Sequence, residues 1–360
     1  MSNKDIFFIN ETLKIASQGK YTVYPNPMVG AILVKNNEII AKGYHKNPGS
    51  PHAEAIAIKN AKGKASGATL YVNLEPCCHF GKTPPCIDLI IKSKIKRVVI
   101  GHFDPNPLVN KKSIRLMRKA NIDVQCGILK EKCIDLNKEF YHHHLTNLPF
   151  ITVKMGLSLD GKVALSNGDS KWITSSISRE DVQHERAKSS IILTTSKTVL
   201  ADNPRMNIRS ASLVNKILKQ PDLAVIDLKS RLSDQYKIFK QKKRNIYLFS
   251  TSGYKKNFPP NVEIIHNISD KRNPMIDILQ ELKRRGHYKI FIESGPTMFS
   301  NLIKSSLLDE LLLYVSPKIL GHTAKSITTI NSIKKLSEKI NFNLHDIIRL
   351  GNDIKIRLGK

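Results

Sequence analysis

The chain has 360 residues, 41% hydrophobic and 24% charged, which is the composition of a globular protein long enough for two domains. No apolar run approaches the roughly 20 residues that span a membrane, and the start, MSNKDIFFINETLK, lacks the apolar core of a secretory signal; we therefore expect a cytoplasmic protein with no membrane partner. The formal net charge of +28 is spread along the chain, which indicates a lysine-rich solvent-facing surface and no specific nucleic-acid partner.

The first part of the chain alternates between helix and strand patterns. A helix is predicted over residues 5–18, followed by a hairpin over 30–45 with its polar turn at Asn36 and Asn37. Further on, the sequence predicts a helix in HAEAIAIKNAKG ending at Gly63, a strand in TLYVNLEP, a helix in CIDLIIKSKI, a strand in RVVIGHFDP, a helix near 111–120 and a strand in IDVQCGIL. This alternation is typical of an α/β layered sandwich, which we assign to residues 1–146.

A second pattern begins after Pro149, and we assign residues 147–360 to a second α/β domain. The pattern begins with the β-rich stretch FITVKMGLSLDGKVAL, and the predicted strands that follow are SIILTTSKTVL, DLAVIDL, NIYLFS, VEIIH, KIFIESG and ELLLYVSPKIL. Between them lie helical stretches, of which the clearest are MIDILQELKRRG and TMFSNLIKSS.

Four residues of the first domain form a pattern that is typical of zinc-dependent deaminases. His52 and Glu54 have the H-x-E spacing at the start of a helix, and Cys77 follows a proline after a strand. Cys86 is the second cysteine, although eight residues separate the pair instead of the usual two. One imidazole and two thiolates leave one zinc position open for water, whose pKa falls to about 7 on the metal. Glu54 is then placed to move protons between that water and the leaving amine.

A structural zinc site is the alternative interpretation of the same residues. Such a site usually has four protein ligands, and Cys78 or His79 offers the fourth. The sequence does not decide between these two kinds of site.

Motifs in both domains are similar to those of the bifunctional riboflavin-biosynthesis deaminase/reductase family. They occur in the family's order along nearly the whole chain: YPNPMVG, HAEAIAI, LEPCCHFGKTPPC, FDPNPLV, KMGLSLDGKVA, SKWITS, ERAKSSIILTTSKTVLADNPR and IESGPT. The resemblance implies a cytidine-deaminase-like α/β/α domain followed by a dihydrofolate-reductase-like domain. It implies deamination of 2,5-diamino-6-(5-phosphoribosylamino)pyrimidin-4(3H)-one, then NADPH reduction of the phosphoribosyl group to phosphoribityl, within a homo-oligomer.

In the deaminase domain the resemblance places the zinc ligands on His52, Cys77 and Cys86, the proton carrier on Glu54, and a pyrimidine contact on Asn26. His45 and His79 also match family positions near the substrate. The chain departs from the family at Tyr24, Cys78 and Lys82, which stand for His, Ser and Arg. Two glycines that are usual in the family are missing from residues 109–113, which leaves the backbone path of that loop open.

The second domain has no G-x-G-x-x-G after a strand, so the usual dinucleotide fingerprint is absent from the sequence. Instead KIFIESGPTMFSNLI predicts a strand, a turn at Gly295 and a helix whose first N–H groups can hold a phosphate. The resemblance implies cofactor contacts at Gly156, Trp172, Thr198, Asp202, Gly295, Pro296, Thr297, Met298, Phe299, Ser300 and Asn301. It implies substrate contacts at Lys154, Ser170, Arg186, Met206, Arg209 and Glu293.

The residue types suit these roles. Arg186 and Arg209 can grip the 5-phosphate of the substrate through charge-assisted hydrogen bonds. Lys154 and Glu293 can hydrogen-bond the ribose hydroxyls. Asn203 and Leu228 stand where the family has Asp and often Ser, which weakens the cofactor site.

Two other functions compete with this interpretation. A nucleic-acid deaminase is favoured only by the high net charge of the chain. Such an enzyme needs a basic face with aromatic side chains that bind a nucleic-acid strand, and the 12 Phe and one Trp of this chain are not clustered in the sequence. A deaminase whose second domain has decayed into a structural module is favoured by Asn203, Leu228 and the lysine-rich middle of that domain. The sequence does not distinguish NADPH from NADH.

Overall fold

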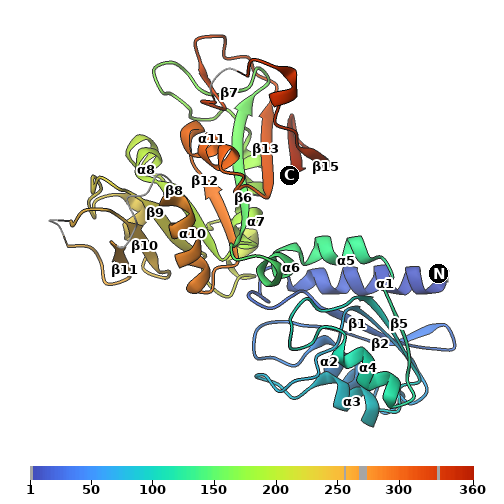
Figure 1. The fold of residues 1–360 in the computed structure, drawn as a ribbon. Coiled ribbons are helices and arrows are strands. Elements are labelled where there is room, and N and C mark those ends of the chain that lie inside the picture. The colour runs from blue at the N-terminus through green and yellow to red at the C-terminus, as the bar shows by residue number, and fades with distance from the viewer. Residues whose placement is uncertain (1–2, 255–256, 267–273, 331–332) are drawn as a thin grey trace. The chain divides into compact units, whose positions relative to one another are not determined.

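The computed structural model describes residues 3–254, 257–266, 274–330 and 333–360. The chain divides into two compact units, Met1–Asn147 and Leu148–Lys360, which are described separately below (Figure 1). Among the described residues, no helix combines the length and apolarity needed to cross a membrane.

The first unit is a three-layer α/β/α sandwich, as the sequence predicted. Its five-stranded sheet has the order β2-β1-β3-β4-β5. Strand β1 is antiparallel to β2 and β3, whereas β3, β4 and β5 run parallel. The elements are α1 (Asn3–Ala16), β1 (Gly30–Lys35), β2 (Glu38–Tyr44), α2 (Ala53–Asn60), β3 (Thr69–Leu74), α3 (Cys86–Lys92), β4 (Arg97–His102), α4 (Lys112–Lys119), β5 (Asp123–Cys126), α5 (Lys130–Leu136) and α6 (Lys138–Leu145).

Both faces of this sheet carry apolar side chains, because its central strands are covered by helices on each side. Helices α2, α3 and α4 pack on one face through residues such as Ala57, Ile90 and Met117. Helix α1 packs on the other face through Phe8 and Ile9 (Figure 1). The predicted hairpin turn is confirmed: β1 and β2 are joined at Asn36 and Asn37, which have φ of 52° and 64°. Asn tolerates this left-handed conformation better than other side chains.

The second unit contains a nine-stranded sheet with the order β11-β10-β9-β8-β12-β6-β13-β16-β15. All its neighbours are parallel except at β16, which is antiparallel to both β13 and β15. The elements are β6 (Phe150–Ser158), β7 (Lys162–Ala164), α7 (Ser176–Ala187), β8 (Ile191–Thr195), α8 (Ser196–Asp202), α9 (Ala211–Val214), β9 (Asp222–Ile226), β10 (Ile246–Phe249), β11 (Val262–Ile265), α10 (Pro274–Arg284), β12 (Lys289–Glu293), α11 (Pro296–Lys304), β13 (Glu310–Ser316), β14 (Lys325–Ser326), β15 (Asn343–Leu350) and β16 (Asp353–Gly359).

Helices cover both faces of this sheet as well. Side chains of α10 and α11, including Leu279 and Phe299, form the core on one face. On the opposite face Val199 of α8 and Val182 of α7 pack against the strands. The parallel strands β6, β12, β8 and β9 therefore end at a common edge, where the loops to the following elements meet.

One expectation for the second unit was wrong, and one of its hairpins was not predicted. The stretch SIILTTSKTVL is not one strand: β8 ends at Thr195, whose side chain caps the N-terminus of α8 by accepting a hydrogen bond from the Thr198 N–H. The hairpin β15–β16 was not predicted, because seven of the eight residues of β15 are exposed. A strand with no buried face shows no alternating hydrophobic pattern.

A buried ion pair joins α1 to the sheet of the first unit. Arg97 Nη1 and Nη2 donate to the two carboxylate oxygens of Asp5 at 2.9 and 3.1 Å, and Tyr71 Oη donates to Oδ1 at 2.9 Å. The hydrogen bonds of Arg97 lower the pKa of Asp5 below its ordinary value of 3.8. Because the folded-state pKa is depressed, this stabilisation is present above about pH 4 and is lost as the pH falls.

We expect Asp5→Asn to lower the free energy of unfolding by about 2 kcal/mol at pH 7, because charged hydrogen bonds to a buried group are lost. Urea unfolding of the full chain would measure this, and the difference from wild type should shrink below pH 4. Asp123→Asn is the matched control, since Asp123 also pairs with Arg97 but is 69% exposed; its effect should stay below about 0.5 kcal/mol. Equal losses in both variants would contradict the assignment.

Candidate active sites

Three predicted ligands converge at the start of two helices in the first unit. His52 precedes the first residue of α2, Cys86 begins α3, and Cys77 lies in the loop after β3. His52 Nδ1 is 3.2 Å from Cys86 Sγ and 3.4 Å from Cys77 Sγ. The three ligand atoms all lie within 4.8 Å of one another. Residues that are far apart in sequence thus form one compact donor group.

This donor group has the dimensions of a tetrahedral zinc site. With Zn–N near 2.0 Å and Zn–S near 2.3 Å, tetrahedral ligands are separated by about 3.5 Å, close to the observed distances. Among the described residues the group has three members, and neither Cys78 nor His79 belongs to it. The Cys78 thiol instead donates to the Leu108 carbonyl at 3.7 Å. The four-ligand structural alternative therefore gains no support, and an ion held by these three residues would keep one position for a ligand that is not a protein side chain.

Nearby groups orient the three ligands. Thr83 Oγ1 lies 3.2 Å from His52 Nε2, which directs the ring so that Nδ1 faces the thiols. The backbone N–H of Cys86 donates to Cys77 Sγ at 3.3 Å. Hydrogen bonding from Cys86, followed by that from His52, lowers the pKa of the Cys77 thiol, which favours the thiolate that binds metal. Sequence analysis missed Thr83, although it lies between the two cysteines.

Glu54 is a buried carboxyl group beside the donor group. It lies in the first turn of α2, is 3% exposed and interacts with the Cys86 thiol. Its Oε2 has no hydrogen-bond partner in the structure. Burial, reinforced by the charge of Cys77, raises the pKa of Glu54 to about 7. A carboxyl group with this pKa can both take and give a proton near neutral pH.

Asn26 and His45 lie next to the metal ligands. The His45 and His52 ring centroids are 5.3 Å apart, and burial lowers the pKa of His45, which favours the neutral ring. His45 Nδ1 is 3.3 Å from the Pro51 carbonyl, and Asn26 Nδ2 is 2.9 Å from His45 Nε2. If Nδ1 carries the proton, Nε2 accepts from the Asn26 amide. Asn26 Oδ1 is then available as an acceptor.

The loop that lacks the two family glycines is held by Glu75. This carboxylate, 3% exposed, accepts hydrogen bonds from the N–H groups of Asp104 and Lys111 at 3.2 and 2.9 Å. It also accepts from the Ser113 hydroxyl at 2.5 Å. Lys111 adopts φ of 59°, the conformation that a glycine would take without strain. The backbone turn is thus kept without glycine, and Ser113 adds a bond that glycine lacks.

In the second unit, a charged cluster lies at the end of β12 and midway along the neighbouring strand β6. Lys154 and Glu293 are direct neighbours across these parallel strands. Arg186 on α7 donates to both oxygens of Glu293, at 2.5 and 2.9 Å. Burial alone would raise the pKa of Glu293, but the charge and hydrogen bonds of Arg186 lower it. Burial also lowers the pKa of Lys154.

The geometry changes the role expected for Arg186. Its guanidinium is occupied by Glu293, by the Asn207 carbonyl at 3.0 Å and by Met206 Sδ at 3.9 Å. This leaves little of Arg186 to grip a phosphate, contrary to the expectation from sequence. Arg209 is exposed, and burial together with the charges of Arg186 and Arg205 lowers its pKa. Arg205, which sequence analysis missed, therefore belongs to the same positive cluster.

The predicted cofactor residues lie at the same edge of the sheet. Gly295 is the N-cap residue of α11, and the space that a Cβ at this position would occupy is open. The neighbouring Ser294 hydroxyl is buried and has no partner in the structure. An unpartnered hydroxyl and an open helix start fit a phosphate-bearing ligand. Pro296 and Thr297 begin the helix, with Met298 and Asn301 further along it.

Two of the predicted cofactor side chains point elsewhere. Phe299 packs in the hydrophobic core, and Ser300 Oγ accepts the Thr329 N–H at 2.7 Å. Only their main-chain atoms are left for a ligand, because consecutive helix residues face different directions. Thr198 and Asp202 lie on α8. Burial raises the pKa of Asp202, and the positive charges of Lys171 and Lys154 act against this rise.

A loop next to α7 carries Ser170 and Trp172. Trp172 is 65% exposed, has φ of 66° and lies 4.0 Å from the Arg179 guanidinium. An exposed indole in a left-handed conformation is unusual, which fits a surface that a ligand covers. Gly156 lies two residues beyond Lys154 on β6.

Comparison with known proteins identifies the family. Residues 149–356 match the model of the RibD C-terminal domain, and residues 2–102 match the cytidine and deoxycytidylate deaminase zinc-binding region. The chain is 39% identical to the riboflavin biosynthesis protein RibD of Buchnera aphidicola and 37% identical to that of Escherichia coli, each over 99% of both chains. This chain belongs to the RibD family. It combines a zinc-binding deaminase domain with a reductase domain, as a bifunctional enzyme of riboflavin biosynthesis.

Solved structures of RibD proteins agree with the fold. RibD of Acinetobacter baumannii is 34% identical, with a TM-score of 0.89 over 99% of this chain and 98% of that one. A diaminohydroxyphosphoribosylaminopyrimidine deaminase/5-amino-6-(5-phosphoribosylamino)uracil reductase of Thermotoga maritima is also 34% identical, with a TM-score of 0.88 over 99% and 98%. The predicted fold class is confirmed, and the match over residues 149–356 weighs against a decayed second domain.

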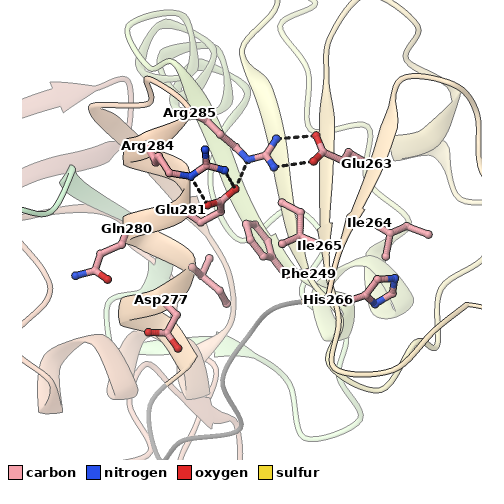
Figure 2. Close-up of a pocket in the computed structure, with 11 residues that line it drawn as sticks. Phe249, Glu263, Ile264, Ile265, His266, Asp277, Gln280, Glu281, Arg284 and Arg285 are labelled. Carbon is pink, nitrogen blue, oxygen red and sulfur yellow. Dashed lines mark hydrogen bonds and ion pairs between the residues drawn. The ribbon is translucent and has the colours of Figure 1, made fainter.

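One pocket in the second unit is not part of either predicted site. It measures about 570 Å³ and lies between β11 and α10, lined by Phe249, Glu263, Ile264, Ile265, His266, Asp277, Ile278, Gln280, Glu281, Arg284 and Arg285 (Figure 2). Arg285 pairs with Glu263 and Glu281, and Arg284 pairs with Glu281. Its acidic and basic side chains largely neutralise one another, and none of the predicted site residues is among this lining.

We expect Ser113→Ala to destabilise the first unit by about 2 kcal/mol, because the buried Glu75 carboxylate loses a hydroxyl donor. Chemical unfolding of the full chain would measure the change, and deamination should show a raised KM because the loop from 104 to 114 loosens. Ser66→Ala, at an exposed position, is the control. An unchanged stability would show that Glu75 does not hold the loop.

Proposed function

We propose that this chain deaminates 2,5-diamino-6-(5-phosphoribosylamino)pyrimidin-4(3H)-one and then reduces the phosphoribosyl group of the product to phosphoribityl with NADPH. The observation that carries the first step is the group of His52, Cys77 and Cys86 beside the unpartnered oxygen of Glu54. The charged cluster around Lys154 and Glu293 supports the second step.

In the deaminase unit, His52, Cys77 and Cys86 would hold zinc and Glu54 would move the protons. Zinc supplies an activated water by lowering its pKa to about 7. With zinc bound, Glu54 would move a proton through Oε2 from the attacking water to the amine that leaves. Its pKa of about 7 suits both transfers.

Substrate orientation in this unit is assigned to Asn26. With its amide nitrogen held by His45, its carbonyl oxygen accepts a hydrogen bond from a ring N–H or amine of the pyrimidine. The neutral His45 acts through this contact and adds no charge. The ring is thereby positioned against the metal group.

In the reductase unit the chain binds and orients, while the nicotinamide cofactor supplies the hydride. The start of α11 at Gly295 holds a cofactor phosphate through its N–H groups. Lys154 and Glu293 hydrogen-bond the ribose hydroxyls, and Arg186 keeps Glu293 ionised and in place. Arg209, with Arg205 beside it, binds the 5-phosphate of the substrate.

The location and assembly stay predictions. Thiolate ligands persist in a reducing compartment, which supports a cytoplasmic location. A homo-oligomer is supported by apolar side chains on the C-terminal hairpin, where Leu344 and Ile347 are 60% and 57% exposed.

We expect Glu54→Gln to retain zinc and to lose ammonia release by about 100-fold or more, because the proton carrier is removed and the metal ligands are not. Metal content and ammonia would be measured on the same preparation. Cys78→Ser is the control, since its thiol lies outside the metal group, and it should keep both properties. Undiminished deamination by Glu54→Gln would refute the role of that carboxyl group.

Arg209→Ala should spare deamination and reduce kcat/KM of the reduction by about 10- to 100-fold, because a charged phosphate contact is lost. Its stability should not change, since Arg209 is exposed. Arg186→Ala should also impair reduction but lower the free energy of unfolding by about 3 kcal/mol, because Glu293 is left buried without its partner. Normal reduction by Arg209→Ala would remove Arg209 from the substrate site.

A further inference from the structure

The loop between α8 and α9 carries the proposed phosphate contact. Residues 203–210 join these two helices, and Arg205 and Arg209 are exposed on the loop. Asn203 and Met206 have φ of 41° and 48°. Left-handed conformations are uncommon for residues other than glycine and persist where the surrounding structure enforces them. The shape of this loop therefore depends on contacts from outside it.

Two arginines hold the first half of the loop through its carbonyl groups. Arg244, two residues before β10, donates from Nη2 to the Arg205 carbonyl at 3.0 Å and from Nη1 to the Met206 carbonyl. Arg186, on α7, donates to the Asn207 carbonyl at 3.0 Å. Three successive carbonyl groups are thus bound by side chains from two distant segments.

Two glutamines hold the second half of the loop. Gln220 binds both main-chain groups of Ile208: its Oε1 accepts from the N–H and its Nε2 donates to the carbonyl, each at 2.8 Å. Gln183, on α7, accepts from the Arg209 N–H at 3.0 Å. Every residue from 205 to 209 therefore has a main-chain group bound by a side chain outside the loop. Because the backbone of Arg209 is fixed in this way, less freedom is lost when its guanidinium binds a phosphate.

Arg244 is a buried cation whose side chain donates to this loop. The residue is 4% exposed, and its Nε has no hydrogen-bond partner among the described residues. Burial, together with the charge of Arg186, lowers the pKa of Arg244 to about 10, so the guanidinium is still charged at neutral pH. A buried cation is costly without an opposite charge nearby. The charges around the loop therefore favour an anion there.

We propose that Arg244, together with Gln220, is a positioning residue of the reductase, which holds residues 205–209 in the shape that presents Arg209 to the 5-phosphate of the substrate. This inference rests on the proposed reductase function. Arg244 acts through the main chain of the loop, since both of its Nη atoms are bound to carbonyl groups. Its effect should therefore fall on substrate affinity and not on hydride transfer.

Steady-state reduction of the phosphorylated substrate by the full chain tests this inference. We expect Arg244→Gln to raise KM by about 10-fold and to change kcat by less than about threefold, because binding of the phosphate is weakened and the chemical step is not. The affinity for NADP⁺, measured by calorimetry, should match that of the wild type. Arg244→Lys should recover part of the affinity for the substrate, because an ammonium group keeps the charge and can donate to a carbonyl.

Arg285→Gln is the matched control in the same unit. Arg285 is 20% exposed and pairs with Glu263 on β11 and with Glu281 on α10. Loss of its guanidinium should leave KM and kcat of the reduction unchanged.

A double-mutant cycle with Arg209→Ala separates positioning of the phosphate contact from general support of the fold. In that background Arg244→Gln should raise KM by less than about twofold, because the contact that Arg244 positions is already absent. The same rise in KM with and without Arg209 would overturn the inference. A wild-type KM of Arg244→Gln would overturn it as well, although the reductase function would stand.

Failure of the proposed function gives a different result, because the wild type itself would then not reduce the phosphorylated substrate with NADPH. If Arg244→Gln does not fold, Gln220→Ala takes its place. We expect Gln220→Ala to raise KM by about threefold or more with kcat retained, because both hydrogen bonds to Ile208 are lost. A wild-type KM of Gln220→Ala would in that case overturn the inference.

Discussion

Both candidate sites depend on one constraint, which is that parallel strands end together at one edge of their sheet. In the first unit, the end of β3 carries Glu75 and Cys77, and the loop after β4 returns to meet it. In the second unit β6, β12, β8 and β9 end in succession, so the segments that follow them form a continuous row. A substrate and a long cofactor can therefore contact the segments that follow several neighbouring strands.

Buried carboxylates hold arginine side chains in position near these edges. Arg186 is bound to Glu293 across 107 residues of sequence, and Arg231 is bound to Asp227 in the adjacent part of the sheet. In each pair the buried carboxylate orients the guanidinium. Because an unpaired buried charge costs several kcal/mol, such pairs are sensitive to loss of either member. The two arginines thus differ in their surroundings: the guanidinium of Arg186 is occupied by Glu293 and the Asn207 carbonyl, whereas Arg209 is exposed.

The metal group shows a similar division between ligands and their supports. His52 and Cys86 are placed by the starts of two helices, Thr83 orients His52, and the Cys86 N–H orients the Cys77 thiol. Glu75 holds the loop of residues 104–114 beside this group through four residues of that loop. Lys111 and Ser113 show that a turn usual for glycine can be kept when a buried acceptor compensates for the strain.

Local sequence patterns determined the alternation of helices and strands, the turn at Asn36 and Asn37, and the separate pieces of the metal-binding motif around His52, Cys77 and Cys86, because each depends on residues a few positions apart. The spacing of His52 and Glu54 was sufficient to place both at one helix start. Only the tertiary structure decided the partners of Arg186, Glu75 and Arg231, since these contacts form between segments that the chain brings together on folding. The hairpin β15–β16 was also beyond the sequence, because an exposed strand buries no face and so carries no hydrophobic alternation.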